Sequence, residues 1–256
     1  MPFALILMIE PHSGPPIIGP IAAMGSFLLT GLGMHVSQTA GLALATDLAT
    51  EESRPRVVAL LYLMLLVGMI SSAVIFAALL DDFSYVRLIQ VIQSAAVITL
   101  ILNVAAMWKQ EVRHPELTDH ERERPTFGSA WGEFINLPKA RRLLWALGLG
   151  TMGFTMQDIL LEPYGAHVLG LSVSETTLLT ALFAGGMVLA LLMTSRTLRR
   201  GVDPIRLASV GVLIGIVAFV AVILSAPLQS TGLFQIGATL IGVGNGLFAV
   251  GMLTAA

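Results

Sequence analysis

Cysteine is absent from the 256 residues of this chain, which excludes disulfide bridges, thiolate nucleophiles and cysteine-based zinc sites within it. Charge is also scarce, because only 12% of the residues are Asp, Glu, Lys or Arg, about half the share typical of soluble domains. The net charge of −2 offers no basic surface for a nucleic acid. With 55% hydrophobic residues, the sequence instead indicates a protein surrounded by a lipid bilayer.

Long apolar runs take the place of the missing charges. A helix needs about 20 such residues to cross the hydrocarbon core of a membrane. Pro227, Gln229 and Ser230 divide the last uncharged stretch into two, since proline cannot continue a helix. The sequence therefore predicts an all-α polytopic membrane protein with about seven transmembrane helices: Ile18–Thr46, Val57–Leu80, Leu88–Trp108, Leu143–Val168, Thr176–Thr194, Leu207–Ala226 and Thr231–Ala256.

The basic residues are distributed unevenly between the loops. All but one of the 14 Lys and Arg residues lie in three loops: the turn with Arg54, the connection Lys109–Arg142, and the turn from Arg196 to Arg206. The loops 81–86, 169–175 and 227–230 contain none. If every predicted helix crosses the membrane, the three basic loops lie on one side, and the positive-inside rule predicts that this side is cytoplasmic.

The long loop divides the chain into three parts. Residues 1–108 are predicted to end an N-terminal helical bundle, with three spans and a partial one, and residues 143–256 to begin a C-terminal bundle of four spans. Between them, residues 109–142 form a cytoplasmic linker. Its second part places Phe127, Trp131 and Phe134 at helical spacing, which predicts an amphipathic helix on the membrane face or, alternatively, one packed against the protein. Since the first and last apolar runs are cut short, we expect an interior fragment of a longer protein.

Two acidic residues are predicted to lie within one transmembrane helix. Asp158 and Glu162 are four residues apart and therefore share a helix face. Asp158 lies about 22 Å along its helix, inside a core about 30 Å thick. A carboxylate at that depth costs about 2.5–3.5 kcal/mol, so Asp158 should face the bundle interior or a cavity. The pair is either a site for a cation, a proton or a polar headgroup, or a structural hydrogen bond to a neighbouring helix. Pro163 predicts a kink or an unwound turn beside it.

Further polar residues define other candidate sites. His35 and Gln38 lie within the first predicted span, where imidazole is either a metal ligand or a hydrogen-bonding group between helices. Asp47 and Arg54 flank the following turn and form either a gating latch or an interfacial charge cluster. No protein metal site and no combination of nucleophile and base is evident, so an enzyme is not predicted.

Amides and glycines in the predicted spans indicate how the helices associate. Gln90, Gln93, Asn103 and Asn245 are predicted to hydrogen-bond between helices. Two groups of glycines are predicted to allow close helix approach: Gly148, Gly150 and Gly153, and Gly242, Gly244, Gly246 and Gly251.

Several longer strings resemble a known family. HVSQTAGLALATDLA, RPRVVALLYLMLLVGM, MQDILLEPYGAHVLGLSVSETTLLTAL and GVGNGLFAVGMLTAA are similar to the PucC/LhaA light-harvesting-complex assembly proteins, the bacteriochlorophyll delivery family of the major facilitator superfamily. The resemblance implies a major-facilitator-type bundle of twelve helices, of which this chain covers roughly the fourth to the tenth. Asp47 and Arg54 match the superfamily's turn between helices four and five. The resemblance also implies that the protein lies in the intracytoplasmic photosynthetic membrane of a bacterium.

The function implied by the resemblance is that of an assembly factor. Such a protein delivers or accommodates bacteriochlorophyll, as bound cargo rather than a resident cofactor, while the light-harvesting α and β polypeptides are assembled. His35 then becomes a candidate ligand for the central magnesium of the pigment, with Gln38, Asp158 and Glu162 as further pigment- or substrate-binding residues. The alternative is a proton-coupled secondary transporter of a small amphiphilic molecule, with Asp158 as its coupling acid.

Overall fold

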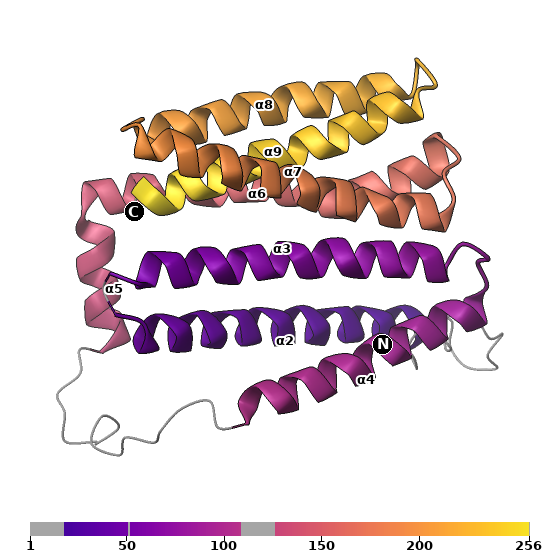
Figure 1. The fold of residues 1–256 in the computed structure, drawn as a ribbon, viewed down its shortest axis with the longest axis horizontal. Coiled ribbons are helices and arrows are strands. Elements are labelled where there is room, and N and C mark those ends of the chain that lie inside the picture. Colours follow the sequence, from indigo (N-terminus) through magenta and orange to yellow (C-terminus); the bar gives the residue numbers. More distant parts are fainter. Residues whose placement is uncertain (1–17, 51, 109–125, 256) are drawn as a thin grey trace. The chain divides into compact units, whose positions relative to one another are not determined.

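The computed structural model describes residues 18–50, 52–108 and 126–255, and within these ranges it contains helices and no strands (Figure 1). This confirms the all-α class. The helices are α2 (Ile18–Leu48), α3 (Arg54–Leu79), α4 (Tyr85–Met107), α5 (Phe127–Asn136), α6 (Pro138–Val168), α7 (Val173–Arg199), α8 (Pro204–Ser225) and α9 (Thr231–Ala255).

The predicted spans coincide with helices to within a few residues at each end. The break assigned to Pro227 is confirmed, because α8 ends at Ser225 and α9 begins at Thr231. The amphipathic segment after residue 126 forms α5, whose first turn is capped by the Thr126 hydroxyl accepting from the Ser129 amide. The short N-terminal run Met1–Ile9 and the first part of the linker, 109–125, lie outside the described residues.

Six helices in the described part of the chain are long and apolar enough to cross a membrane: α2, α3, α4, α7, α8 and α9. The predicted count of seven is therefore too high by this criterion. The segment Leu143–Val168 does form a helix, α6, but this helix is not apolar enough to count among the candidate membrane spans. Gln157, Asp158 and Glu162 interrupt its apolar sequence and lower its hydropathy.

The helices form two compact units. The first holds α2, the first part of α3 up to Leu65, and α4, whereas the second holds Leu66–Ala78 of α3 together with α5 to α9. The predicted division of the chain at residues 108 and 143 stays a prediction.

Helix α9 is the centre of the second unit, and it packs against α8, α7 and α6. Phe234, Ala238 and Ile241 of α9 are fully buried. Small residues permit this packing, as predicted for the second glycine group. A methyl group added at Gly244 would meet the Gly211 carbonyl of α8 at 2.7 Å, and one at Gly251 would meet the Pro204 carbonyl at 2.7 Å. The backbones of α8 and α9 therefore touch along their length.

The three glycines of the first group, on α6, differ in whether they contact a neighbouring helix. Gly150 lies against the ring of Phe248, so α6 approaches α9 there. A methyl group at Gly148 or Gly153 would meet nothing within 4 Å among the described residues, so the prediction of close approach is wrong for these two positions. On α9, Gly244 and Gly251 are seven residues apart and face α8, whereas Gly242 and Gly246 are four apart and face α7. Among the glycines of α6, those on its packed face are Gly150 and Gly165.

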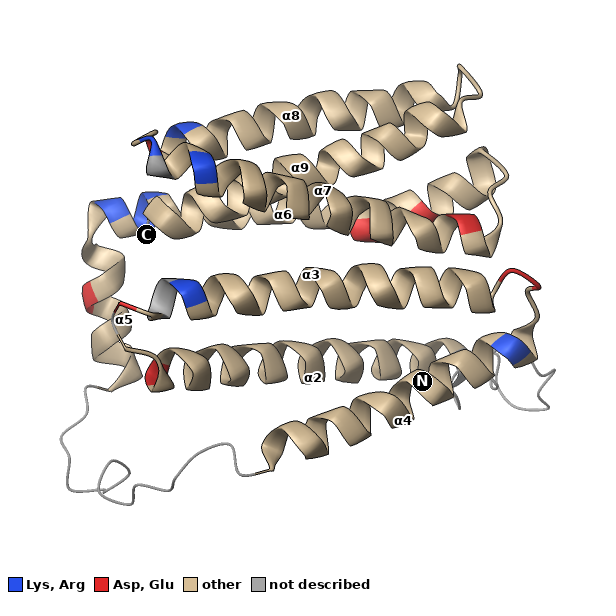
Figure 2. Ribbon diagram, viewed as in Figure 1, with Lys and Arg blue, Asp and Glu red and all other residues tan. Residues whose placement is uncertain are grey.

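Basic residues gather at one end of the second unit (Figure 2). Basic residues lie where α6 and α8 begin and where α7 ends, and these three positions are at the same end of the unit. Acidic residues of α6 and α7 lie toward the opposite end, but α5 also contains Glu133, and Asp203 caps the start of α8. The basic residues of α6, α7 and α8 thus gather at one end, as the alternation of basic and non-basic loops predicts.

Candidate functional site

The carboxylates of α6 line a pocket in the second unit. The buried strip of α6 contains Phe154, Gln157, Leu161 and Gly165, at successive spacings of three, four and four residues. Asp158 and Glu162 each follow a member of this strip by one residue, about 100° further around the helix. The pocket has a volume of about 170 Å³ and is lined by Met69, Gln157, Asp158, Leu161, Glu162, Leu179, Thr180 and Phe183.

Hydrogen bonds connect the two carboxylates to different neighbours. The Gln157 amide donates to Asp158 Oδ1, and the Thr180 hydroxyl of α7 donates to Glu162 Oε1 at 3.4 Å. Gln157 is 5% exposed, so its amide is held inside the helix packing. The structure therefore brings Asp158 and Glu162 to one pocket, as predicted, and the long bond from Thr180 links Glu162 to a neighbouring helix.

No cation compensates these carboxylates within the residues that the structure describes. The ion pair recorded there joins Arg87 and Asp82, at 3.5 Å, at the start of α4. A pocket with two carboxylates, an amide and a hydroxyl offers oxygen atoms to a proton, a hard cation or an ammonium group. Both interpretations of the two carboxylates, as a site for such a group and as a structural hydrogen bond to a neighbouring helix, stay predictions.

Of the kink or unwound turn predicted at Pro163, the unwound turn is wrong and the kink stays a prediction. Helix α6 continues through Pro163 to Val168 and then ends, with the amide of Leu169 bonded to the Gly165 carbonyl at 3.2 Å. Proline removes one backbone hydrogen bond, but the packing of Leu161 and Gly165 on either side holds the helical path. Tyr164 adds a long hydrogen bond of 3.4 Å to the Ile223 carbonyl of α8.

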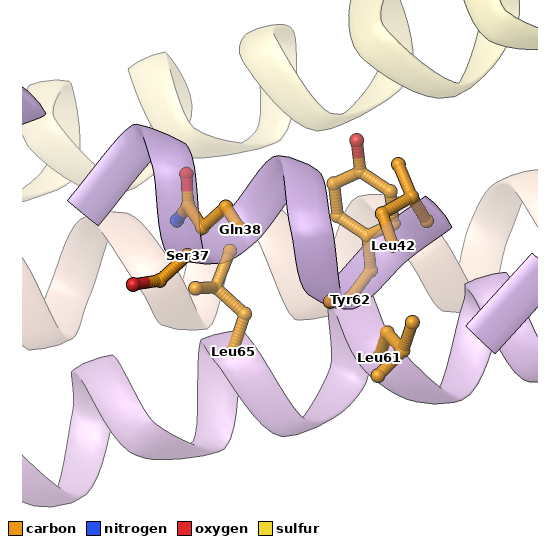
Figure 3. Close-up of a pocket in the computed structure, with 7 residues that line it drawn as sticks. Ser37, Gln38, Leu42, Leu61, Tyr62 and Leu65 are labelled. Carbon is orange, nitrogen blue, oxygen red and sulfur yellow. The ribbon is translucent and has the colours of Figure 1, made fainter. Parts of the chain in front are cut away.

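A second pocket lies in the first unit, between α2 and α3 (Figure 3). Its volume is about 320 Å³. The predicted residue Gln38 lines it, together with Ser37, Gly41 and Leu42 of α2 and Leu61, Tyr62 and Leu65 of α3. Apolar surface dominates the lining, and the polar groups drawn in Figure 3 are the Ser37 hydroxyl, the Gln38 amide and the Tyr62 hydroxyl. This is the composition typical of a site for a largely apolar ligand.

His35 lies one helical turn before this pocket. It precedes Gln38 by three residues and Leu42 by seven, so the three residues share one stripe of α2. Its side chain is exposed, and its carbonyl accepts the Thr39 hydroxyl at 2.8 Å. Both interpretations of His35, as a metal ligand and as an interhelical hydrogen-bonding group, stay predictions.

The proposed latch residues occupy the turn between α2 and α3. Asp47 is exposed at the end of α2. The side chain of Arg54 lies outside the part of the chain that the structure describes, so its pairing with Asp47 stays a prediction. The turn itself is closed by Thr50 and Ser53, whose hydroxyls are 2.8 Å apart and whose backbones bond at 3.0 Å.

Two of the amides predicted to join helices have defined partners. Asn245 of α9 points its amide at the Met187 sulfur of α7, 4.0 Å away, so this interhelical contact is confirmed. Asn103 instead donates to the Thr99 carbonyl of its own helix at 2.8 Å, and the prediction is wrong for its amide nitrogen.

Four polar residues of the two pockets escaped the sequence analysis: Gln157, Thr180, Ser37 and Tyr62. Gln157 could have been found, because it directly precedes Asp158 and belongs to the buried strip with period 3.6. Thr180 gave no such signal, since a threonine hydroxyl in an apolar helix usually bonds its own backbone. Ser37 and Tyr62 likewise did not stand out from their apolar surroundings. Their roles depend on which neighbouring helix they face.

Comparison with known proteins places these features in a family. The model of the PUCC protein family matches residues 1–256. Protein PucC of Rhodovulum sulfidophilum is 50% identical over 261 residues, covering 100% of this chain and 58% of that protein. Protein PucC of Cereibacter sphaeroides is 43% identical over 258 residues, covering 100% and 56%.

A more distant relative carries an enzyme's name. The bacteriochlorophyll synthase 44.5 kDa chain of Rhodobacter capsulatus is 27% identical over 241 residues, covering 90% of this chain and 54% of that protein. This chain thus spans a little over half the length of the curated relatives it matches. No solved structure matches it. With the family model covering the whole chain and relatives up to 50% identical along it, the chain belongs to the PucC protein family.

Proposed function

We propose that this chain is part of a membrane assembly factor for bacterial light-harvesting complexes, which delivers or accommodates bacteriochlorophyll and is not itself an enzyme. Membership of the PucC family supports this proposal, and one relative bears the name of bacteriochlorophyll synthase. The structural observation that carries it is the apolar pocket of about 320 Å³ between α2 and α3. The light-harvesting α and β polypeptides are the partners in this proposal.

The size and lining of the pocket suit part of a large amphiphile. Ligand pockets commonly measure about 300–1,000 Å³, so this one is at the lower end. It would hold the edge or the hydrocarbon tail of a pigment rather than the whole molecule. Gln38 and Tyr62 supply hydrogen-bond donors for a carbonyl group of the ligand. His35, on the same stripe of α2, supplies an imidazole for the central magnesium.

The test is purification of the protein from pigmented membranes in mild detergent. We expect bacteriochlorophyll absorption and light-harvesting polypeptides to co-purify with it. Gln38→Leu should lower the pigment retained per protein about two- to ten-fold, because one hydrogen bond contributes about 0.5–1.5 kcal/mol. His35→Phe should shift or remove the pigment band. Gln90→Leu, an amide replacement in α4 away from the pocket lining, is the matched control and should leave the spectrum unchanged.

Either of two outcomes would contradict this proposal. If neither pigment nor light-harvesting polypeptides accompany the unsubstituted protein, the proposed function is wrong. If pigment is retained but Gln38→Leu and Gln90→Leu behave alike, the pigment binds elsewhere. An unchanged band in His35→Phe would leave His35 with the hydrogen-bonding interpretation only.

We further propose that the complete protein is a twelve-helix bundle of the major facilitator type in the photosynthetic inner membrane, with its basic loops cytoplasmic and Asp47 and Arg54 forming a latch. Helix α6 then crosses the membrane although it is less apolar than the other six. It packs along α7 and α9, which are both long enough to span. Its polar residues Gln157, Asp158 and Glu162 line the pocket between α6 and α7, where Gln157 is buried and the two carboxylates stay exposed.

A proton-coupled transporter of a small amphiphile is the second candidate, and the uncompensated carboxylates of α6 favour it. Asp158 and Glu162 share a pocket with Thr180, and no ion pair to either carboxylate is found among the described residues. Liposome uptake driven by a proton gradient would support this function. Asp158→Asn should abolish the gradient dependence, whereas Asp82→Asn, at the start of α4, should not. Uptake that is equal with and without a gradient would refute it.

A further inference from the structure

Helix α5 extends from the end of the second unit at which α6 begins. It runs crosswise to α6, which begins directly after it, at the end where α7 finishes and α8 begins (Figure 1). The same end carries the basic residues of α6, α7 and α8 (Figure 2). A helix perpendicular to one that crosses the membrane has the orientation of a helix that lies in the plane of the bilayer surface.

One face of α5 is aromatic and exposed. Phe127, Trp131 and Phe134 recur at i, i+4 and i+7, which places them on one stripe. Their rings pack on each other, with centroids 6.0 Å apart for Phe127 and Trp131 and 6.2 Å apart for Trp131 and Phe134. They nevertheless remain 81%, 45% and 41% exposed, respectively. The described residues therefore do not bury this face, which weakens the interpretation of α5 as a helix packed on the protein.

Basic side chains follow immediately at the start of α6. Lys139, Arg141 and Arg142 are exposed, and Glu133 is the acidic residue of α5. In the portion of the chain covered by the structure, none of these three cations forms an ion pair with a carboxylate. An uncovered aromatic stripe beside a net positive charge is complementary to a surface that is apolar just below a layer of negative charge.

We infer that α5 and the first turn of α6 form a docking surface for anionic phospholipid headgroups. The aromatic stripe inserts at the level where headgroups meet acyl chains, as Trp does at membrane interfaces. Lys139, Arg141 and Arg142 then hold phosphate groups beside it, because each cation is attracted to anionic lipid near the surface. This surface binds lipid of the surrounding bilayer and is independent of pigment binding.

Trp131 provides a direct probe of this surface. In the protein reconstituted into nanodiscs, every other tryptophan is replaced by Phe; within this chain these are Trp108 and Trp145, which are both exposed. The quenching of Trp131 fluorescence is then measured with phosphatidylglycerol or phosphatidylcholine at equal mole fraction. Each lipid is brominated either near the headgroup or near the end of the acyl chain.

The proposal predicts strong quenching by lipids brominated near the headgroup and weak quenching by those brominated near the chain end. Brominated phosphatidylglycerol should be enriched about three-fold or more over phosphatidylcholine around Trp131. Replacing Lys139, Arg141 and Arg142 with Gln should bring this ratio to one without abolishing the quenching. The matched control replaces Arg196, Arg200 and Arg206, at the α7–α8 turn, with Gln and should preserve the ratio.

Three results would overturn the proposal. One is a Trp131 that is quenched by aqueous iodide but not by brominated lipid, which would place α5 in water. Another is an equal effect of the two lipids in the single-tryptophan protein with all its basic residues intact, a measurement that does not depend on the folding of any charge variant. The third is loss of the lipid preference in the control triple variant as well, because net charge alone would then explain it.

Discussion

Close contact between α8 and α9 gives the sharpest prediction for stability. Gly211 and Gly244 face each other where these helices cross, and each presents its carbonyl to the other's Cα. A methyl group added at Gly244 would lie 2.7 Å from the Gly211 carbonyl oxygen and 2.9 Å from the Gly215 nitrogen. All of these atoms belong to backbone, so no side-chain rotation can relieve the overlap.

The expected cost of Gly244→Ala follows from this geometry. Non-bonded atoms prefer separations of about 3.5 Å, so the two backbones would have to part by roughly 0.8 Å. Overpacking of this kind costs about 1–3 kcal/mol. Alanine recovers up to about 1 kcal/mol through its better helix propensity. We therefore expect the free energy of unfolding to fall by about 1–2 kcal/mol.

Unfolding in bicelles, followed by steric trapping, measures this change directly. Gly153→Ala in α6 is the matched control, because its added methyl group would meet nothing within 4 Å among the described residues. It should be neutral or stabilising by up to about 1 kcal/mol. The double variant of Gly211 and Gly244 should cost at least about 0.5 kcal/mol less than the sum of the single variants, because the helices need to separate only once. Equal effects of Gly244→Ala and Gly153→Ala would refute the proposed contact between α8 and α9.

Three further predictions concern caps, buried hydroxyls and topology. Ser172→Ala removes the side-chain half of the capping box that begins α7 and should lower the unfolding free energy by about 1 kcal/mol; no loss would show that the cap is not formed. Thr194→Val should be neutral or stabilising, because the buried Thr194 hydroxyl has no partner among the described residues. Thr176→Val removes the 3.0 Å hydrogen bond from the Thr176 hydroxyl to the Val173 carbonyl and should destabilise the protein by about 1 kcal/mol in the same assay. Since the chain has no cysteine, Ser129→Cys should react with an impermeant maleimide from the cytoplasmic side and Leu228→Cys from the opposite side; labelling of both from one side would refute the topology.

The sequence alone determined the helices and their ends. Lipid cannot hydrogen-bond the backbone, so each long apolar run must satisfy its own amides as a helix. The break at Pro227 and the amphipathic helix after residue 126 follow from equally local rules. The pairing of Asp158 with Glu162 in one pocket was predictable for the same reason, because both belong to one helix and a fixed period relates them.

Only the tertiary structure decided which helix faces which. The hydrophobic pattern of a transmembrane helix is nearly uniform around its circumference, so it does not mark the packed face. For that reason Gly148 and Gly153 could not be distinguished in advance from Gly150, which meets Phe248. Thr180 and Tyr62 likewise became pocket residues only once α7 was placed beside α6, and α3 beside α2. A helix in lipid forms through interactions within one segment of the chain, whereas a pocket forms only where two segments pack against each other.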